Sequence, residues 1–204
     1  MRKVEITLND EVAQKLEAVA SKLGLELGDF LARGIQEYTY QYVTTTSGEW
    51  MPLDQWNALV GGEGCPLCTE IASTKIADEY GYTVADLNMG RLRLGARQFA
   101  LGYCVLICKK HVREPYELNI EERSIFFEDL MHAAQAIDKV FNPLKMNLEI
   151  LGNTIPHLHC HIIPRYFGDP SPNGPLHPHE NVPLLTPQEY EERAKLIQAA
   201  LKVQ

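Results

Sequence analysis

The sequence predicts an α+β protein in which a small β-α-α module precedes an antiparallel sheet with one long helix. Apolar and polar residues alternate over residues 3–8, and two stretches with helical apolar spacing follow. Beyond residue 63, strand-like stretches lie on either side of one long amphipathic stretch, whose apolar stripe is Phe126, Leu130, Ala133, Ile137 and Val140. Strands that can pair as hairpins, together with a single long helix, are typical of an antiparallel α+β domain.

The composition is that of a soluble globular protein. The chain has 204 residues, of which 45% are hydrophobic and 23% charged. A net charge of −8 gives no general attraction for nucleic acid or anionic membranes. The N-terminus has no apolar signal core, and the longest apolar run, residues 99–108, is too short to span a bilayer. With five cysteines outside any small disulfide framework, we expect a cytoplasmic protein whose thiols are reduced.

Residues 1–45 are predicted to form a strand followed by two helices, and residues 46–62 a packed connector to the main domain at residues 63–204. The main domain is predicted to end in a C-terminal helix that begins at Thr186 and Pro187. Asn9 can cap the first helix and Gly24 can end it, while the second runs from about residue 29 to 42. The apolar stripe of the first helix consists of Val12, Leu16, Val19 and Leu23. This order resembles the ribbon-helix-helix module, in which strands of two chains pair and the helices interlock. The resemblance implies a homodimer.

DNA binding, which many such modules perform, is not expected from the charges. Residues 1–45 contain five basic and seven acidic side chains. Glu26 and Asp29 fall at the start of the second helix, where carboxylates would repel a phosphate. We therefore interpret the module as a dimerisation device rather than a DNA reader.

The main domain contains three histidines at alternate positions. The segment IPHLHCHIIPRY, residues 155–166, is rich in strand-forming residues and predicts a short strand. Because strand side chains alternate between faces, His157, His159 and His161 would share one face, roughly 7 Å apart. A strand near residues 146–151 and a tight LGN turn precede this segment, and strands at residues 91–95 and 103–110 come earlier. Asn119 and Glu122 form a capping box for the long helix.

These motifs, in this order over residues 63–170, resemble the histidine triad (HIT) family. The resemblance implies a hydrolase that binds a nucleotide ester such as a phosphoramidate or a dinucleoside polyphosphate. In this family the middle histidine, here His159, attacks the α-phosphorus and forms a covalent nucleotidyl-histidine, which water or another acceptor resolves. His161 would donate to the phosphate oxygens, and a histidine at that place favours hydrolysis over transfer. Polar side chains that would contact the substrate are Asn147, Asn153 and Thr154.

The family resemblance also gives a use for the close pair Cys65 and Cys68. Together with His111 and His157, they match the zinc ligands of some HIT proteins, and two thiolates with two imidazoles suit tetrahedral zinc. Four protein ligands would leave no open position, so this zinc would be structural. The remaining cysteines, Cys104, Cys108 and Cys160, are predicted to be small buried hydrophobic residues.

One position departs from the family pattern. Many HIT hydrolases hold the ribose hydroxyls with an acidic residue at a place where this chain has Gly95. The nearby Arg91, Arg93 and Arg97 could instead contact additional phosphates, or be ordinary surface charges. Two other functions stay open: a zinc-dependent hydrolase whose three histidines hold a catalytic metal, and a DNA-binding regulator with a nucleotide-sensing HIT domain.

Overall fold

The computed structural model describes residues 7–22, 24–32, 35, 50–176, 182 and 184–202. The chain divides into two compact units, Met1–Trp50 and Met51–Gln204, and the division falls inside the segment predicted as a connector. None of the helices in the described ranges combines the length and apolarity needed to cross a bilayer.

The N-terminal unit contains the predicted helices. Helix α1 (Asp10–Lys22) begins where Asn9 caps it, since the Asn9 side chain accepts a hydrogen bond of 2.9 Å from the Val12 amide. Residues 27–32 form the start of the second helix. The predicted strand and the rest of the second helix lie largely outside the described residues, so the structure shows helices here but no ribbon-helix-helix module.

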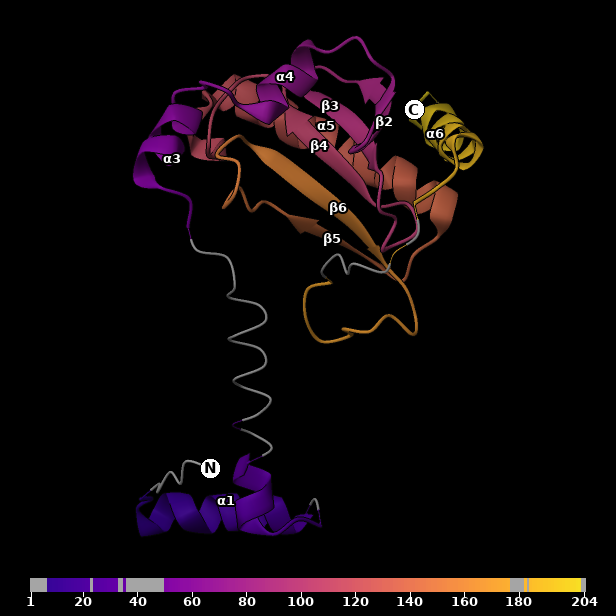
Figure 1. Cartoon of the computed structure of the whole chain (residues 1–204). Helices are drawn as coiled ribbons and strands as arrows, with labels where there is room; N and C mark the ends of the chain where they lie inside the picture. The colour runs from indigo at the N-terminus through magenta and orange to yellow at the C-terminus, as the bar shows by residue number, and fades with distance from the viewer. Residues whose placement is uncertain are drawn as a thin grey trace. The chain divides into compact units, whose positions relative to one another are not determined.

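The second unit is built on a six-stranded antiparallel sheet with the order β1-β2-β3-β4-β6-β5 (Figure 1). The strands are β1 (Ala77–Asp78), β2 (Gly81–Asp86), β3 (Gly90–Gly95), β4 (Cys104–Cys108), β5 (Lys145–Glu149) and β6 (His159–Arg165). The helices are α3 (Leu53–Val60), α4 (Pro66–Ala72), α5 (Ile120–Phe141) and α6 (Pro187–Leu201), with a 3₁₀ turn, η1 (Pro115–Glu117). The predicted antiparallel sheet with one long helix is confirmed.

Helix α5 is the long helix, and its capping box is present as predicted. The Asn119 side chain accepts from the Glu122 amide, and the Glu122 carboxylate accepts from the Asn119 amide. The helix ends at Asn142, whose φ of 47° places it in the left-handed region that terminates helices.

The two faces of the sheet have different roles. One face packs on α5, which contacts β3, β4 and β6. The core on this side includes Leu92, Leu94, Cys104, Leu106, Cys108, Cys160 and Ile162, so the three cysteines are buried as predicted. In the strand register Arg93 pairs with Val105, and Val105 pairs with His161. These residues share the opposite face, which α5 leaves open for a site.

The histidine strand is shorter than predicted, because β6 begins only at His159. The amide of His157 donates to the carbonyl of Ile155 at 2.8 Å, which closes a three-residue turn around Pro156. The fixed φ of proline suits the centre of such a turn. The prediction that all three histidines share one strand face is therefore wrong for His157, which precedes the strand.

Candidate functional site

His159 and His161 lie at the start of β6, with ring centroids 5.0 Å apart. Nδ1 of His159 is 2.6 Å from the carbonyl oxygen of His157. Since a carbonyl oxygen can only accept, Nδ1 carries the proton and the lone pair of the neutral imidazole lies on Nε2. An exposed lone pair on Nε2 is what a nucleophilic histidine requires.

Burial keeps both rings neutral. It lowers the pKa of His159 below the usual imidazole range, although the hydrogen bond to the His157 carbonyl opposes this. Burial, followed by the neighbouring His159, lowers the pKa of His161 to about 4. Near pH 7 each ring is therefore an uncharged imidazole.

The two histidines line a cavity of about 990 Å³. That volume is at the upper end of the range for small-molecule sites, roughly 300–1,000 Å³. The cavity is bounded by α4 and the segment after it, by β1, and by the open face of β3 and β4. Its lining residues include Leu67, Thr69, Glu70, Ser73, Lys75, Asp78, Glu79, Tyr80, Arg93, Gly95, Val105, Ile107 and Ile155.

Buried ion pairs occupy the wall of the cavity formed by α4, β1 and β3, which β4 separates from the histidines of β6. Arg93 is only 5% exposed and pairs with Glu70 and with Asp78, at 2.8 Å from Asp78 Oδ1. It also donates to the Gly81 carbonyl at 2.7 Å. Hydrogen bonds from Arg93 and from the Tyr80 amide outweigh the effect of burial and hold the pKa of Asp78 at about 2. The charge of Arg93 is thus paired with the carboxylates of Glu70 and Asp78.

The Arg91 guanidinium also has protein partners, so the structure does not support the suggestion that Arg91 and Arg93 contact additional phosphates. Its Nε lies 2.8 Å from Asp86 Oδ1, and its Nη1 donates to the carbonyls of Glu70 and Ser73 at 2.7 and 2.9 Å. Arg97 is not among the residues that line the cavity.

The four predicted metal ligands meet in one cluster beside this cavity. Cys65 Sγ lies 3.4 Å and Cys68 Sγ 3.5 Å from His157 Nδ1, and the Nδ1 atoms of His111 and His157 are 3.1 Å apart. All four ligand atoms lie within 4.8 Å of one another. A tetrahedral zinc site with ordinary bond lengths needs ligand separations of roughly 3.3–3.8 Å. The cluster could therefore hold a metal ion.

Backbone carbonyls orient both imidazoles of the cluster. Nε2 of His157 lies 2.7 Å from the Cys108 carbonyl oxygen, and Nε2 of His111 lies 3.1 Å from that of Val60. Each Nε2 therefore carries the proton, and each Nδ1 presents its lone pair to the cluster. Within the described part of the chain, this is the one group of three or more such side chains arranged to hold a metal. His159 and His161 do not belong to it.

The predicted substrate-binding side chains are less central. Asn147 lies on β5 opposite Ile163, and Asn153 and Thr154 are exposed in the turn before Ile155. The neighbouring Ile155 lines the cavity, whereas Asn147, Asn153 and Thr154 do not. Their roles remain predictions.

Sequence reasoning missed two features of the site. One is the carboxylate wall of Glu70 and Asp78, because α4 and β1 were not predicted and nothing in the spacing links them to the histidines. The other is Tyr103, whose hydroxyl oxygen is 2.7 Å from Nδ1 of His161. A tyrosine beside an apolar strand resembles any other buried aromatic residue, so no sequence pattern identified it.

Comparison with known proteins is consistent with this geometry. A family model described as the HIT domain matches residues 92–168. Protein hit of Bacillus subtilis (strain 168) is 31% identical over 114 residues, which cover 51% of this chain and 72% of that protein. The asymmetrical bis(5'-nucleosyl)-tetraphosphatase of Schizosaccharomyces pombe is 34% identical over 77 residues, which cover 35% of this chain and only 42% of that enzyme.

Solved structures share the fold. A histidine triad protein from Sinorhizobium meliloti matches 62% of this chain and 97% of its own, with a TM-score of 0.56 and 23% identity. One from Marinobacter aquaeolei matches 68% of this chain and 96% of its own, with a TM-score of 0.58 and 23% identity. Given also the 31% identity to Protein hit over 72% of its length, this chain belongs to the HIT family.

Proposed function

We propose that this protein is a nucleotide hydrolase or nucleotidyl transferase of the HIT type. Its substrate would be a nucleoside phosphoramidate, a dinucleoside polyphosphate or a related phosphate ester. The observation that carries the proposal is the hydrogen bond of 2.6 Å from His159 Nδ1 to the His157 carbonyl, which leaves the Nε2 lone pair available beside the cavity.

In the proposed reaction, Nε2 of His159 attacks the α-phosphorus and forms a nitrogen–phosphorus bond. The bond to the leaving group breaks, and the leaving group departs with the bonding electrons. Water then attacks the phosphorus, and the imidazole leaves with its electron pair restored. The proton that the water loses balances the proton that the leaving group takes up. His161, the other histidine that lines the cavity, donates a hydrogen bond to the phosphate oxygens as negative charge builds on them.

The charges of the cavity favour one group of substrates. Glu70, Asp78 and Glu79 outnumber Lys75 and Arg93, and Arg93 is already paired with two of these carboxylates. A second phosphate group placed against this wall would meet net negative charge. We therefore rank phosphoramidates and simple esters of a nucleoside monophosphate ahead of dinucleoside polyphosphates.

The test is turnover of adenosine phosphoramidate and of diadenosine polyphosphates by the wild type and by His159→Ala. We expect the substitution to lower kcat by about a thousandfold or more, because it removes the nucleophile. The matched control is His132→Ala, which removes an imidazole on α5 whose one side-chain hydrogen bond among the described residues is to the Leu201 carbonyl. A wild type that binds nucleotide but turns over neither substrate would instead support the sensor function.

We also propose that the cluster of Cys65, Cys68, His111 and His157 holds a structural zinc ion. The donor atoms fit tetrahedral zinc, and four protein ligands leave no position for substrate or water. When bound, zinc would fasten the start of α4 to the segment before β6. Elemental analysis should therefore find about one zinc per chain in both the wild type and His159→Ala. Loss of zinc together with activity in His159→Ala would instead indicate a three-histidine metal centre.

For the N-terminal unit we propose a ribbon-helix-helix-like module that makes the protein a homodimer. Support comes from α1, where Val12 and Val19 are 39% and 45% exposed along one apolar stripe. A short α-helical unit cannot bury such a stripe by itself, whereas a second copy can cover it. The acidic balance of residues 1–45 supports self-association over DNA binding.

A further inference from the structure

Tyr103 lies directly before β4, and its hydroxyl oxygen is 2.7 Å from Nδ1 of His161. The two rings are nearly parallel, with an interplanar angle of 10° and centroids 6.0 Å apart. Tyr103 is only 9% exposed, and burial raises the pKa of its phenol, which therefore keeps its proton. The proposed reaction gives this hydrogen bond no role.

The structure makes specific room for the Tyr103 ring. Gly95 lies across the strand pair, and its amide donates to the Tyr103 carbonyl at 3.1 Å. A Cβ atom at Gly95 would lie 2.5 Å from Cε1 and 2.6 Å from Cδ1 of Tyr103, so the ring fits only because residue 95 is glycine. The Phe99 ring packs against it with centroids 4.4 Å apart. Because Gly95 has no side chain, there is space for the Tyr103 phenol beside His161.

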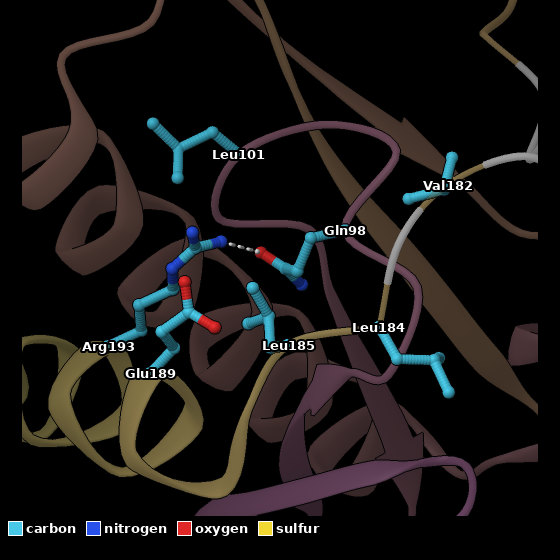
Figure 2. A pocket seen from close by; sticks show the side chains of 7 residues that line it. All are labelled: Gln98, Leu101, Val182, Leu184, Leu185, Glu189 and Arg193. Carbon is cyan, nitrogen blue, oxygen red and sulfur yellow. Dashed lines mark hydrogen bonds between the residues drawn. The ribbon is translucent and has the colours of Figure 1, made fainter.

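The backbone of Tyr103 is also held in place. The side-chain amide of Gln98 donates to the carbonyls of Gly95 and Tyr103 at 2.9 and 2.8 Å. Its oxygen accepts from the Gly102 amide at 2.9 Å and from Arg193 of α6 at 3.3 Å, the contact drawn in Figure 2. Gln98 and Arg193 line a separate pocket of about 430 Å³ between α6 and the β3–β4 loop. Gln98 and Arg193 therefore hold the backbone of Tyr103 in place.

The direction of the hydrogen bond follows from the partners. Among the residues that the structure describes, His161 Nδ1 is the one acceptor placed for the Tyr103 O–H. A buried phenol without an acceptor would leave its O–H unsatisfied, so the O–H donates to Nδ1. A neutral imidazole that accepts at Nδ1 carries its own proton on Nε2.

We infer that Tyr103 is a positioning residue that holds the proton of His161 on Nε2. His159 has the opposite tautomer, because its Nδ1 donates to a carbonyl and its lone pair lies on Nε2. The two neighbouring rings therefore offer a lone pair and an N–H donor to the same phosphate. This role for Tyr103 rests on the proposed function, and Tyr103 itself neither gains nor loses a covalent bond in it.

The test is Tyr103→Phe, which keeps the ring packing against Gly95 and Phe99 and removes only the O–H donor. We expect kcat for adenosine phosphoramidate to fall by about tenfold to a hundredfold with KM within about twofold, because the donor acts on the charge that develops during reaction. Tyr166→Phe is the matched control, since its hydroxyl donates to the Leu101 carbonyl of the β3–β4 loop at 2.9 Å. An unchanged kcat in Tyr103→Phe would overturn the role.

A second measurement needs no turnover. Nitrogen-15 NMR of the folded protein should find His161 protonated on Nε2 in the wild type and partly or wholly on Nδ1 in Tyr103→Phe, while His159 stays protonated on Nδ1 in both. Gly95→Ala, which pushes a methyl group into the Tyr103 ring, should shift His161 in the same direction. A wild type that turns over no nucleotide would end the proposed function, and the tautomer of His161 would still decide for or against Tyr103. A His161 tautomer that is the same in all three proteins would overturn the inference.

Discussion

Among single residues outside the site, Asp129 is a buried carboxylate that accepts several hydrogen bonds. This α5 carboxylate is 3% exposed and accepts hydrogen bonds from the amides of Met89 and Gly90 at 2.6 and 3.0 Å. It also accepts from Asn88 at 3.2 Å, so it ties the β2–β3 turn to the long helix.

We predict that Asp129→Ala lowers the free energy of unfolding by about 2–4 kcal/mol, because it leaves buried backbone donors without an acceptor. Urea denaturation measures the change. Glu128→Ala removes an exposed carboxylate one position earlier on α5 and should stay within about 0.5 kcal/mol of the wild type. Equal effects of the two substitutions would contradict this account of the turn.

For single residues, the sequence predicted the members of the metal cluster but not the hydrogen-bond partners of the proposed catalytic histidines. The residue types and the family resemblance predicted a cluster of Cys65, Cys68, His111 and His157, and these four side chains do lie together. The partner of His161 could not be predicted, since Tyr103 lies 58 positions away and only the strand pairing brings the two together. His157 was predicted inside the strand, because an alternating pattern does not reveal the turn at Pro156.

At the scale of elements, α4 serves two parts of the protein. Cys65 is its N-cap residue and Cys68 lies in its first turn, and both belong to the metal cluster. The same helix places Leu67, Thr69 and Glu70 in the wall of the cavity. A helix of seven residues has little stability of its own, so its position depends on what holds its start.

We therefore predict that removing the proposed zinc ion loosens α4 and one wall of the cavity while α5 stays folded. Chelation of the purified protein, or Cys68→Ser, should raise amide hydrogen exchange in α4 and weaken binding of adenosine monophosphate by about tenfold. Cys104→Ala removes a buried thiol outside the cluster and should change neither. Unaltered exchange in α4 after complete removal of the metal would count against the link between the two sites.

Elements were predictable where the local pattern was strong. The capping box and the long apolar stripe of α5 identified it, and Thr186 begins α6 as expected. The short helices α3 and α4 and the strands β1 and β2 were missed, because their packing depends on partners distant in the sequence. Strand order has the same origin, since β6 pairs between β4 and β5.

For the molecule as a whole, the exposed apolar stripe of α1 predicts self-association through the N-terminal unit. Replacing Val12 and Val19 together by Asp should lower the mass measured by sedimentation equilibrium from that of a dimer toward that of a monomer, because it puts charge on the apolar stripe. Gln14→Asp adds an acidic residue to an exposed position of α1 outside that stripe and should leave the mass unchanged. A wild type that is monomeric at micromolar concentration would overturn the module proposed for residues 1–45.

The five cysteines give the protein a chemical property that none of its sites has alone. Cys104, Cys108 and Cys160 are fully buried, and burial raises the pKa of each thiol, so a reagent in solution meets three inert groups. The remaining two sulfurs belong to the metal cluster, and Cys68 is the more exposed of them. A thiol-reactive dye would consequently react first at Cys68, and only slowly, because burial raises the pKa of this thiol as well, to about 11. Zinc in the cluster would block that reaction, so uptake of the dye would report an empty cluster.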